Sequence, residues 1–258
     1  MLQTVRTDRI LSLLEDQKAC SIAALARDLG VSEETIRRDV RRLEQLGRVR
    51  KVHGGVRLAT NQPEAPYRAR LREAALAKRA IGEAAARMVE PGMTVLVDSG
   101  TTSFWTARAL SHRQGLTIVT NSLDVASETL GQSDHRLVFT GGELDVDYRA
   151  AFCAAAIASA RQFVFDVAIL SVGAIEARHG LLDFDSNEAN FKRAVLDRAR
   201  RIVVVADRSK FDRTGTRQVA DVGAIDDLVT DAAPAGPLAS ALAQAGVRVT
   251  VASVDRDG

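Results

Sequence analysis

The sequence predicts two domains, a small unit of three helices with a hairpin and a larger α/β domain built on a largely parallel sheet. Three observations support this prediction. Apolar residues recur at helical spacing in three stretches before residue 46, and a hairpin pattern follows them. Beyond residue 90, short β-rich runs alternate with helical stretches, which is typical of a parallel sheet covered on both faces. A chain of 258 residues is long enough for both.

The composition is that of a globular protein with an aliphatic core, since 46% of the residues are hydrophobic and only 4% are aromatic. Acidic residues interrupt the apolar N-terminus, which argues against a signal peptide, and no apolar run approaches a membrane span. We therefore expect a cytoplasmic protein without a membrane partner. Cys20 and Cys153 are predicted to be free thiols, and the scattered histidines indicate no metal site. We expect no cofactor.

The first two helices are predicted from their apolar stripes. Residues 5–16 carry one stripe, and Ser21 is a suitable N-cap for a second helix that starts at Ile22. Gly30 then suits a left-handed helix end. Ser32 is placed to cap a third helix directly after this turn, so the three helices are predicted to form a helix-turn-helix.

The third helix is predicted to have one apolar and one charged side. Ile36, Val40 and Leu43 share one face, and Arg37, Arg38 and Arg41 fall on the other with Glu34. Residues 37–51 hold seven cationic side chains and two acidic ones, and residues 1–60 carry a net charge of +4. Such a face suits the DNA phosphate backbone, although a solvated, salt-bridged helix is the simpler alternative for a charge run alone.

A short hairpin follows this helix. Val49, Val52, Val56 and Leu58 flank a His53-Gly54-Gly55 turn, where glycine tolerates positive φ angles. A hairpin joined to a helix-turn-helix makes a winged version of that fold.

The spacing of Arg6, Ile10, Leu14, Ser32 and residues 35–40 resembles the N-terminal signature of DeoR-family bacterial transcription regulators, and residues 50–55 resemble the family's wing. The resemblance covers roughly residues 3–58 and implies DNA binding. We expect Asp39 to form a salt bridge that orients Arg38 or a wing residue. The candidate DNA-binding residues are Ser32, Glu34, Thr35, Arg37, Arg38, Arg41, Arg42, Arg50, Lys51 and His53.

The predicted domains are a winged helix-turn-helix at 1–58, a linker at 59–72 and an α/β effector-binding domain at 73–258. The linker prediction rests on the small and polar residues that accompany two prolines at 59–67. A helix is expected to follow as far as Val89. The strands of the second domain are predicted at 93–97, 116–119, 136–139, 167–172, 202–206, 228–230 and 247–251.

Polar residues follow several of these strands, at the edge where ligands bind in such sheets. The run Asp98-Ser99-Gly100-Thr101-Thr102-Ser103 opens a helix and offers hydroxyls, a glycine and free N–H groups, which suit a phosphate but also occur as a plain helix cap. Lys210 is a cation placed to meet a phosphate, with an ordinary surface lysine as the alternative. Asp98, Asn121 and Asp207 can bind sugar hydroxyls.

The order of these loops also resembles the C-terminal effector domain of the DeoR family, whose fold is similar to ribose-5-phosphate isomerase and the CoA transferases. Family members typically sense a phosphorylated sugar or polyol. The resemblance assigns to the effector pocket Asp98, Ser99, Gly100, Thr101, Thr102, Asn121, Gly141, Gly142, Glu188, Lys192, Asp207 and Lys210. Residues 151–154 depart from the family, which usually has a glycine there, so ligand contacts to the backbone at this loop can differ.

These residues are compatible with three functions. The leading one is a transcriptional regulator, a repressor of a sugar or polyol catabolic operon by family expectation, whose affinity for a DNA operator depends on a phosphorylated sugar or polyol. Such heads generally act in symmetric oligomers, here a homodimer or tetramer. A sugar-phosphate isomerase is the enzymatic alternative, but its catalytic residues cannot be mapped onto this chain. A ligand-free architectural DNA-binding protein is the third.

Overall fold

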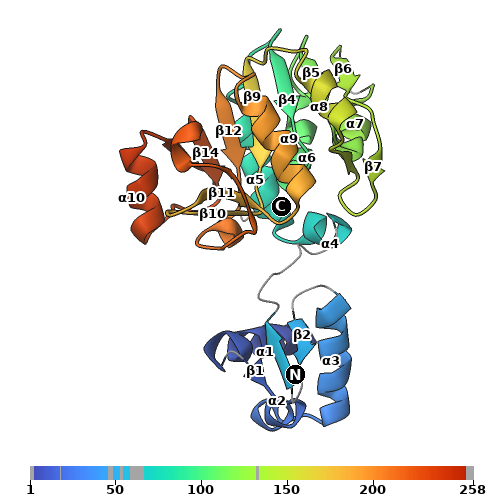
Figure 1. Cartoon of the computed structure of the whole chain (residues 1–258), viewed down its shortest axis with the longest axis vertical. Coiled ribbons are helices and arrows are strands. Elements are labelled where there is room, and N and C mark those ends of the chain that lie inside the picture. The colour runs from blue at the N-terminus through green and yellow to red at the C-terminus, as the bar shows by residue number, and fades with distance from the viewer. Residues whose placement is uncertain are drawn as a thin grey trace. The chain divides into compact units, whose positions relative to one another are not determined.

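The computed structural model describes residues 3–17, 19–45, 49–52, 55–58, 67–131 and 134–253. The chain divides into two compact units, Met1–Pro66 and Tyr67–Gly258, which can be followed in Figure 1. Each unit contains its own hydrophobic core. Among the helices in the described ranges, none has the length and apolar character needed to cross a membrane.

Three helices form the first unit, as predicted: α1 (Gln3–Gln17), α2 (Ile22–Leu29) and α3 (Glu33–Gln45). Ser21 caps α2, because its Oγ accepts a hydrogen bond of 3.1 Å from the backbone N–H of Ala24. Gly30 ends α2 with a φ of 63°, a left-handed conformation that glycine adopts without a steric penalty. Both features agree with the sequence prediction.

The hairpin after α3 consists of β2 (Val49–Val52) and β3 (Gly55–Leu58), which pair antiparallel. A short strand, β1 (Ala19–Cys20), pairs with the other side of β3. A Cβ atom on Gly55 would lie 2.4 Å from the carbonyl oxygen of Cys20, so this close approach requires glycine. The unit is therefore a winged helix-turn-helix, and turn residues 53 and 54 of the wing lie outside the described residues.

The second unit is organised around a seven-stranded parallel sheet, with strand order β15-β14-β12-β9-β4-β5-β6. All the predicted strands are present, each end within one residue of its expected place. Their bounds are Thr94–Val97 for β4, Thr117–Thr120 for β5, Arg136–Phe139 for β6, Val167–Ser171 for β9, Ile202–Val205 for β12, Asp227–Thr230 for β14 and Arg248–Val251 for β15.

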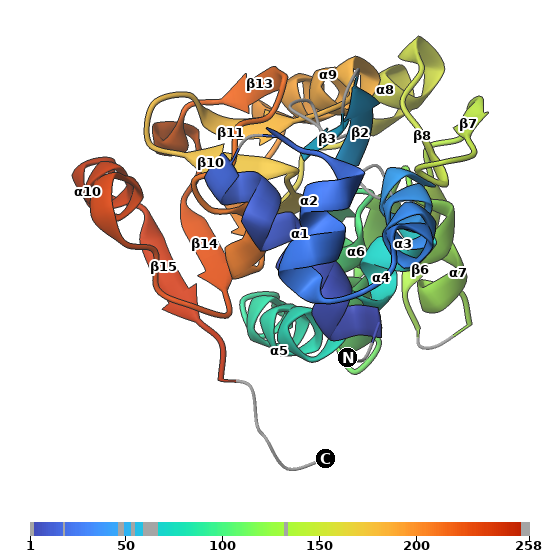
Figure 2. The ribbon, with the colours of Figure 1, turned by 90° about the horizontal axis from the view of Figure 1, so that it is seen from below.

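Helices cover both faces of this sheet. One face packs against α5 (Ala75–Ala86), α6 (Thr101–Leu110) and α7 (Leu123–Thr129), and the other against α8 (Ala154–Ala160), α9 (Ser186–Leu196) and α10 (Gly236–Gln244). Figure 2 shows α8 and α9 on one side of the unit and α5 on the other. Side chains alternate along β4. Val97 packs in the core on the side of α5, α6 and α7, and Leu96 in the core on the side of α8, α9 and α10. The predicted three-layer α/β architecture is confirmed.

Two smaller sheets were not predicted. Strands β10 (Ala174–Glu176), β11 (Gly180–Asp183) and β13 (Arg217–Ala220) form an antiparallel sheet, and β7 (Leu144–Asp145) pairs with β8 (Ala150–Ala151). Two short 3₁₀ turns, η1 (Arg208–Lys210) and η2 (Val222–Ala224), follow β12 and β13. Strand β11 of the antiparallel sheet ends at Asp183, a buried carboxylate.

The linker ends earlier than the sequence analysis expected. Residues 67–72, assigned to the linker, form helix α4 (Tyr67–Arg72), which clusters with the second unit. The side chains of Tyr67 and Arg70 are buried, so this segment packs as part of the domain. Ala74, with a φ of 50°, separates α4 from α5, where one continuous helix was expected. Residues 59–66 lie outside the described residues.

Candidate functional site

Helix α3 presents a basic face to solvent, as its sequence predicts. Its apolar side is buried in the core of the first unit, while four arginines are exposed: Arg37, Arg38, Arg41 and Arg42. Arg37 pairs with Glu33 at 2.7 Å and with Glu34 at 3.4 Å. Arg38 has no ion pair or hydrogen bond with any residue in the described ranges. An exposed, unpaired guanidinium is the group best able to meet a phosphate or a base edge.

The start of α3 is fixed by its predicted cap. Ser32 Oγ accepts a hydrogen bond of 3.2 Å from the backbone N–H of Thr35, and the two hydroxyl oxygens lie 2.8 Å apart. The wing is tied to the same helix, since Lys51 Nζ lies 2.7 Å from Glu44 Oε2. The hydrogen bond from Lys51 lowers the pKa of Glu44. The side chain of Arg50 and all of His53 lie outside the described residues, so their roles stay predictions.

Asp39 forms the buried salt bridge of this unit, but with a partner that the sequence analysis did not name. Its carboxylate lies 2.5 Å from Nε and 3.2 Å from Nη2 of Arg6, and its side chain is only 1% exposed. The expected partner, Arg38 or a wing residue, is thus replaced by Arg6. Arg6 lies on α1, so the pairing depends on how α1 packs against α3. The bridge holds α3 in the domain, and Arg38 stays accessible to solvent.

In the second unit, the predicted effector residues gather where the order of the sheet reverses. Strands β5 and β6 follow on one side of β4, and β9 and the later strands lie on its other side. A topological switch point of this kind opens a crevice at the carboxyl ends of the strands. Asp98 follows β4, and both of its carboxylate oxygens lie 3.1 Å from the backbone N of Ser171, at the end of β9. Asp98 thus spans the switch point.

A buried charge network extends from this carboxylate. Lys192 Nζ lies 2.8 Å from Asp183, 2.9 Å from Glu188 and 3.7 Å from Asp98. Burial raises the pKa of Asp98 to about 7, although Lys192 and the Ser103 hydroxyl oppose this shift. Burial also disfavours charge on Lys192, but the surrounding carboxylates outweigh it and raise its pKa. Asp183 was not among the predicted pocket residues, because it lies on the strand β11 that the sequence analysis missed.

The predicted phosphate cradle forms the N-terminus of α6. Gly100 precedes this helix with a φ of 141°, and a Cβ there would lie 1.9 Å from Ser171 Oγ. Ser171 Oγ donates a hydrogen bond of 2.9 Å to the carbonyl of Ser99. Thr101 and Thr102 are buried in the first turn, where backbone N–H groups lack intrahelical partners. Glycine at position 100 therefore allows the backbone to approach the switch point closely.

The glycine loop after β6 lies against residues 151–154, which depart from the family pattern. Gly141 and Gly142 have positive φ values, and a Cβ on Gly142 would lie 2.5 Å from Cys153 Sγ. Hydrogen bonds from the backbone N–H groups of Ala156 and Glu143 lower the pKa of this thiol. Asn121, after β5, donates a hydrogen bond of 3.1 Å to the carbonyl of Ala151 in the same region. The sulfur of Cys153 thus occupies the space beside these backbone groups.

A buried lysine that the sequence analysis did not identify adds a positive charge. Lys78, on α5, is 3% exposed, and its Nζ lies 2.5 Å from the carbonyl oxygen of Arg70. Burial lowers the pKa of Lys78 to about 8; the charge of Asp207 opposes this shift and that of Lys210 adds to it. The structure therefore places Lys78 in the field of the two predicted residues that follow β12. Its position depends on the packing of α5, which sequence periodicity does not give.

Several buried polar atoms in the described residues lack a hydrogen-bond partner. They are Tyr67 Oη, Ser99 Oγ, Trp105 Nε1, Asn121 Oδ1, Thr140 Oγ1 and Thr230 Oγ1. Ser99 is the second residue after β4, Asn121 and Thr140 directly follow β5 and β6, and Thr230 ends β14. Buried polar groups in proteins are almost always paired, so these unpaired groups along one edge of the sheet are candidates for contacts with a polar ligand.

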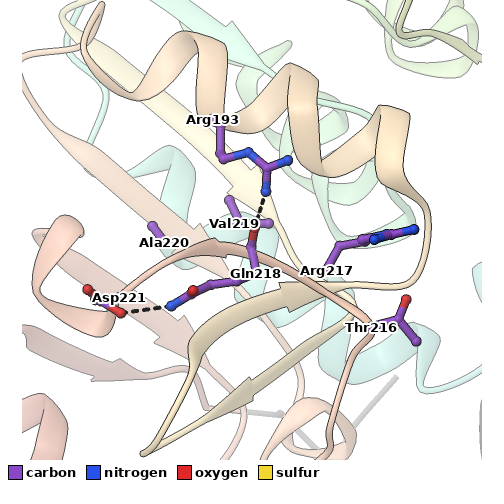
Figure 3. A pocket seen from close by; sticks show the side chains of 7 residues that line it. All are labelled: Arg193, Thr216, Arg217, Gln218, Val219, Ala220 and Asp221. Carbon is purple, nitrogen blue, oxygen red and sulfur yellow. Dashed lines mark hydrogen bonds between the residues drawn. The ribbon is translucent and has the colours of Figure 1, made fainter.

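A surface hollow of about 500 Å³ lies elsewhere, between α9 and β13 (Figure 3). It is lined by Arg193 and residues 216–221. The guanidinium of Arg193 donates a hydrogen bond to the carbonyl of Gln218, which ties the helix to the strand. None of the predicted effector residues lines this hollow.

The sequence of the chain matches two family models. The model described as the DeoR-like helix-turn-helix domain matches residues 6–62, and that of the DeoR C terminal sensor domain matches residues 73–232. The Glycerol-3-phosphate regulon repressor of Escherichia coli K12 is 32% identical over 234 residues, covering 91% of this chain and 93% of that protein. The transcriptional repressor AccR of Agrobacterium fabrum is 34% identical over 231 residues, covering 88% of each.

Solved structures give weaker matches. The eIF2B-beta2-delta2 complex from C. thermophilum has a TM-score of 0.48 at 17% identity, covering 93% of this chain and 82% of that one. Ribose 5-phosphate isomerase from Plasmodium falciparum has a TM-score of 0.40 at 14% identity and covers 55% of each chain. Neither carries an argument about function, and the sequence relatives are named as repressors rather than enzymes. The two family models and these relatives show that the chain belongs to the DeoR family of DNA-binding transcriptional regulators.

Proposed function

We propose that this protein represses a sugar or polyol catabolic operon and that a phosphorylated sugar or polyol, bound at the carboxyl edge of the large sheet, changes its affinity for the operator. The observation that carries the proposal is the row of buried polar atoms after β4, β5 and β6 that have no partner among the described residues. The same domain holds the buried cation Lys78, within the field of Asp207 after β12. Hydroxyls and amides suit a polyol, and an ammonium suits its phosphate.

The residues of the pocket have distinct roles in this proposal. The N-terminus of α6, with Ser99, Gly100, Thr101 and Thr102, offers free N–H groups and hydroxyls to a phosphate. Lys78 and Lys210 supply positive charge, and Asn121 and Asp207 accept hydrogen bonds from sugar hydroxyls. The network of Asp98, Glu188 and Lys192 forms a rigid floor, because its charges already satisfy one another. Gly141 and Gly142 give the ligand access to backbone groups beside Cys153.

The first unit supplies the DNA contacts. The exposed arginines of α3 approach the major groove, and Lys51 with Arg50 and His53 of the wing reaches the neighbouring backbone or minor groove. Each neutralised phosphate releases counterions, so binding depends on salt. A homodimer or tetramer places two such heads on a two-fold symmetric operator, and light scattering of the purified protein tests this stoichiometry.

Glycerol 3-phosphate is the first ligand to test, because relatives from Escherichia coli and Haemophilus influenzae are named as glycerol-3-phosphate regulon repressors. The experiment measures fluorescence anisotropy of a labelled fragment from upstream of this protein's own operon, with competitor DNA and a panel of sugar and polyol phosphates. We expect competitor-resistant binding that one phosphate shifts and its unphosphorylated parent does not. Binding without sequence preference and without any response would instead favour an architectural DNA-binding protein.

Trp105 allows ligand binding to be followed without DNA. It is the single tryptophan of the chain and lies on α6, whose N-terminus forms the proposed phosphate cradle. Its indole N–H is buried without a partner in the described residues, so its fluorescence should respond to changes at α6. A saturable change with a phosphorylated ligand would support the pocket. Lys78→Ala and Lys210→Ala should each weaken that binding by about tenfold, as expected for a lost charged contact.

A further inference from the structure

Helix α4 is the first element of the second unit and follows directly on the linker residues in the sequence. It contacts α6, the helix that opens with the proposed phosphate cradle, and the two lie together in Figure 2. Its sequence, Tyr-Arg-Ala-Arg-Leu-Arg, is half arginine, yet Tyr67 is 3% exposed and Arg70 is 9% exposed. A six-residue helix that buries its aromatic and one of its arginines is held by specific contacts.

The hydroxyl of Tyr67 has no hydrogen-bond partner among the described residues, although it is buried. Burial raises the pKa of this phenol; the charge of Asp124 acts in the same direction, as does that of Asp98, while Arg70 and Arg149 oppose it. The phenol therefore lies within the electrostatic reach of Asp98, the carboxylate at the switch point. A buried O–H without a partner is destabilising, because it has given up its hydrogen bonds to water and gained none in return.

Contacts on both sides hold α4 in this position. The guanidinium of Arg70 lies 5.9 Å from the ring centre of Tyr67 and also 5.9 Å from that of Tyr148, which belongs to the loop between β7 and β8. Tyr148 in turn packs edge-on against Phe152, whose ring contacts Phe191 of α9. The backbone of α4 is also fixed, because Lys78 Nζ binds the carbonyl oxygen of Arg70.

We propose that the Tyr67 hydroxyl is a further ligand-binding group, which donates a hydrogen bond to an oxygen of the phosphorylated sugar or polyol. This inference rests on the function proposed above and adds a contact on α4 to those at the strand ends. The ligand then contacts the Tyr67 hydroxyl directly. Arg70, whose guanidinium lies over the rings of Tyr67 and Tyr148, keeps this hydroxyl in place. Ligand binding would thereby involve α4 directly, the helix that follows the linker residues in the sequence.

The test compares Tyr67→Phe with the wild-type protein, using Trp105 fluorescence and the sugar-phosphate that binds the wild type most tightly, starting with glycerol 3-phosphate. The substitution removes one oxygen and keeps the ring that stacks on Arg70. We expect the dissociation constant to rise by about tenfold, as for the loss of one buried hydrogen bond. The melting temperature without ligand should stay the same or rise, because an unpartnered buried hydroxyl has been removed.

The matched control is Tyr148→Phe, which removes the hydroxyl from the ring on the other side of Arg70. Its ligand affinity should stay within about a factor of two of the wild type. Unchanged affinity of Tyr67→Phe would overturn the inference. So would equal losses in both variants, or a loss accompanied by a lower ligand-free melting temperature, since either result assigns the hydroxyl a structural role. A wild-type protein that binds no member of the panel would overturn the proposed function itself.

Discussion

The charges on the exposed face of α3 and those around Lys192 at the switch point are arranged in opposite ways. On α3, Arg37 is about half exposed, and its partners Glu33 and Glu34 belong to the same helix. In the pocket, Lys192 and its partners Asp98 and Asp183 have side chains that are only 1% exposed and come from three different elements. The ion pairs on the exposed face of α3 are solvated and lie within one helix, whereas those of Lys192 are buried and link α9 to β11 and to the residue that follows β4.

This difference bears on what each region does. An exposed ion pair contributes little to stability, so DNA phosphates can displace the acidic partners of α3 at small cost. Buried charges are retained only when each has a partner, because removing one leaves the others desolvated and uncompensated. Under the proposed function, the α3 face is thus suited to exchanging partners, and the buried network around Lys192 to keeping its geometry when a ligand binds and dissociates. The four predictions that follow separate these two kinds of charge.

The largest effect is expected for Lys192→Met. This change leaves Asp98, Asp183 and Glu188 buried around an apolar side chain. Breaking a buried ion network by removing one partner typically costs about 3–5 kcal/mol. We expect a loss of that size in the free energy of unfolding of the second unit, measured by urea denaturation with Trp105 fluorescence.

Arg37→Met is the matched control, because it removes a cation from an exposed ion pair. Its effect on the free energy of unfolding of the first unit, followed by circular dichroism, should stay within about 1 kcal/mol. If Lys192→Met cost no more than Arg37→Met, the contrast between solvated and buried charges would be wrong.

A smaller effect is expected for Arg38→Ala, on DNA binding alone. Arg38 is exposed and unpaired in the described residues, so its loss should not unfold the domain. We expect operator affinity to fall by about tenfold at physiological salt. If Arg38 contacts a phosphate, the slope of log K against log salt should fall by about 0.9; an unchanged slope with relaxed base preference indicates a base contact.

The control for this prediction is Arg87→Ala, which removes an exposed arginine that follows α5 in the second unit. Affinity for the operator should stay close to that of the wild type. Equal losses in both variants would mean that only net charge matters, and the assignment of α3 to the groove would fail.

Ligand binding should depend on pH through Lys78. The pKa of this lysine is lowered to about 8, so it is charged at neutral pH and loses its proton as the pH rises through 8. The affinity for a phosphorylated ligand should therefore fall several-fold between about pH 7 and pH 9, measured by Trp105 fluorescence. In Lys78→Arg, which keeps its charge over this range, the decline should disappear. A decline of equal size in both proteins would exclude Lys78 as its cause.

The parts of the fold that the sequence predicted are those with a strong local pattern. The five central strands of the large sheet are short apolar runs buried on both faces. The three N-terminal helices have apolar stripes, and Ser21 and Ser32 cap the second and third. Helix α4 has no such pattern, because arginine occupies every second position from Arg68 to Arg72. Its helical state depends on burial of Tyr67 and Arg70 against the domain, a tertiary effect.

The pocket shows the same limit. Asp98, Ser99 and Asn121 were predicted because each lies within two residues of the end of a strand, and parallel strands bring their carboxyl ends to one edge. Asp183 lies in a short antiparallel strand with a bulge, and Lys78 lies within a helix, so neither follows a strand of the large sheet. Chain order therefore indicated Lys210, which follows β12, but could not indicate Lys78.

The smallest effect is expected for Glu34→Gln, which tests whether Glu34 contacts DNA or holds arginines back from it. Glu34 lies 3.4 Å from Arg37 and 3.6 Å from Arg41, and its side chain is 61% exposed. If it only screens these cations, its neutralisation should tighten DNA binding a few-fold at low salt and much less at high salt, where exposed charges are screened. Weaker operator binding would instead make Glu34 a base contact, since a carboxylate can accept a hydrogen bond from cytosine N4. Anisotropy titrations at two salt concentrations distinguish these outcomes, because screening predicts a gain that salt removes and a base contact predicts a loss that salt does not restore.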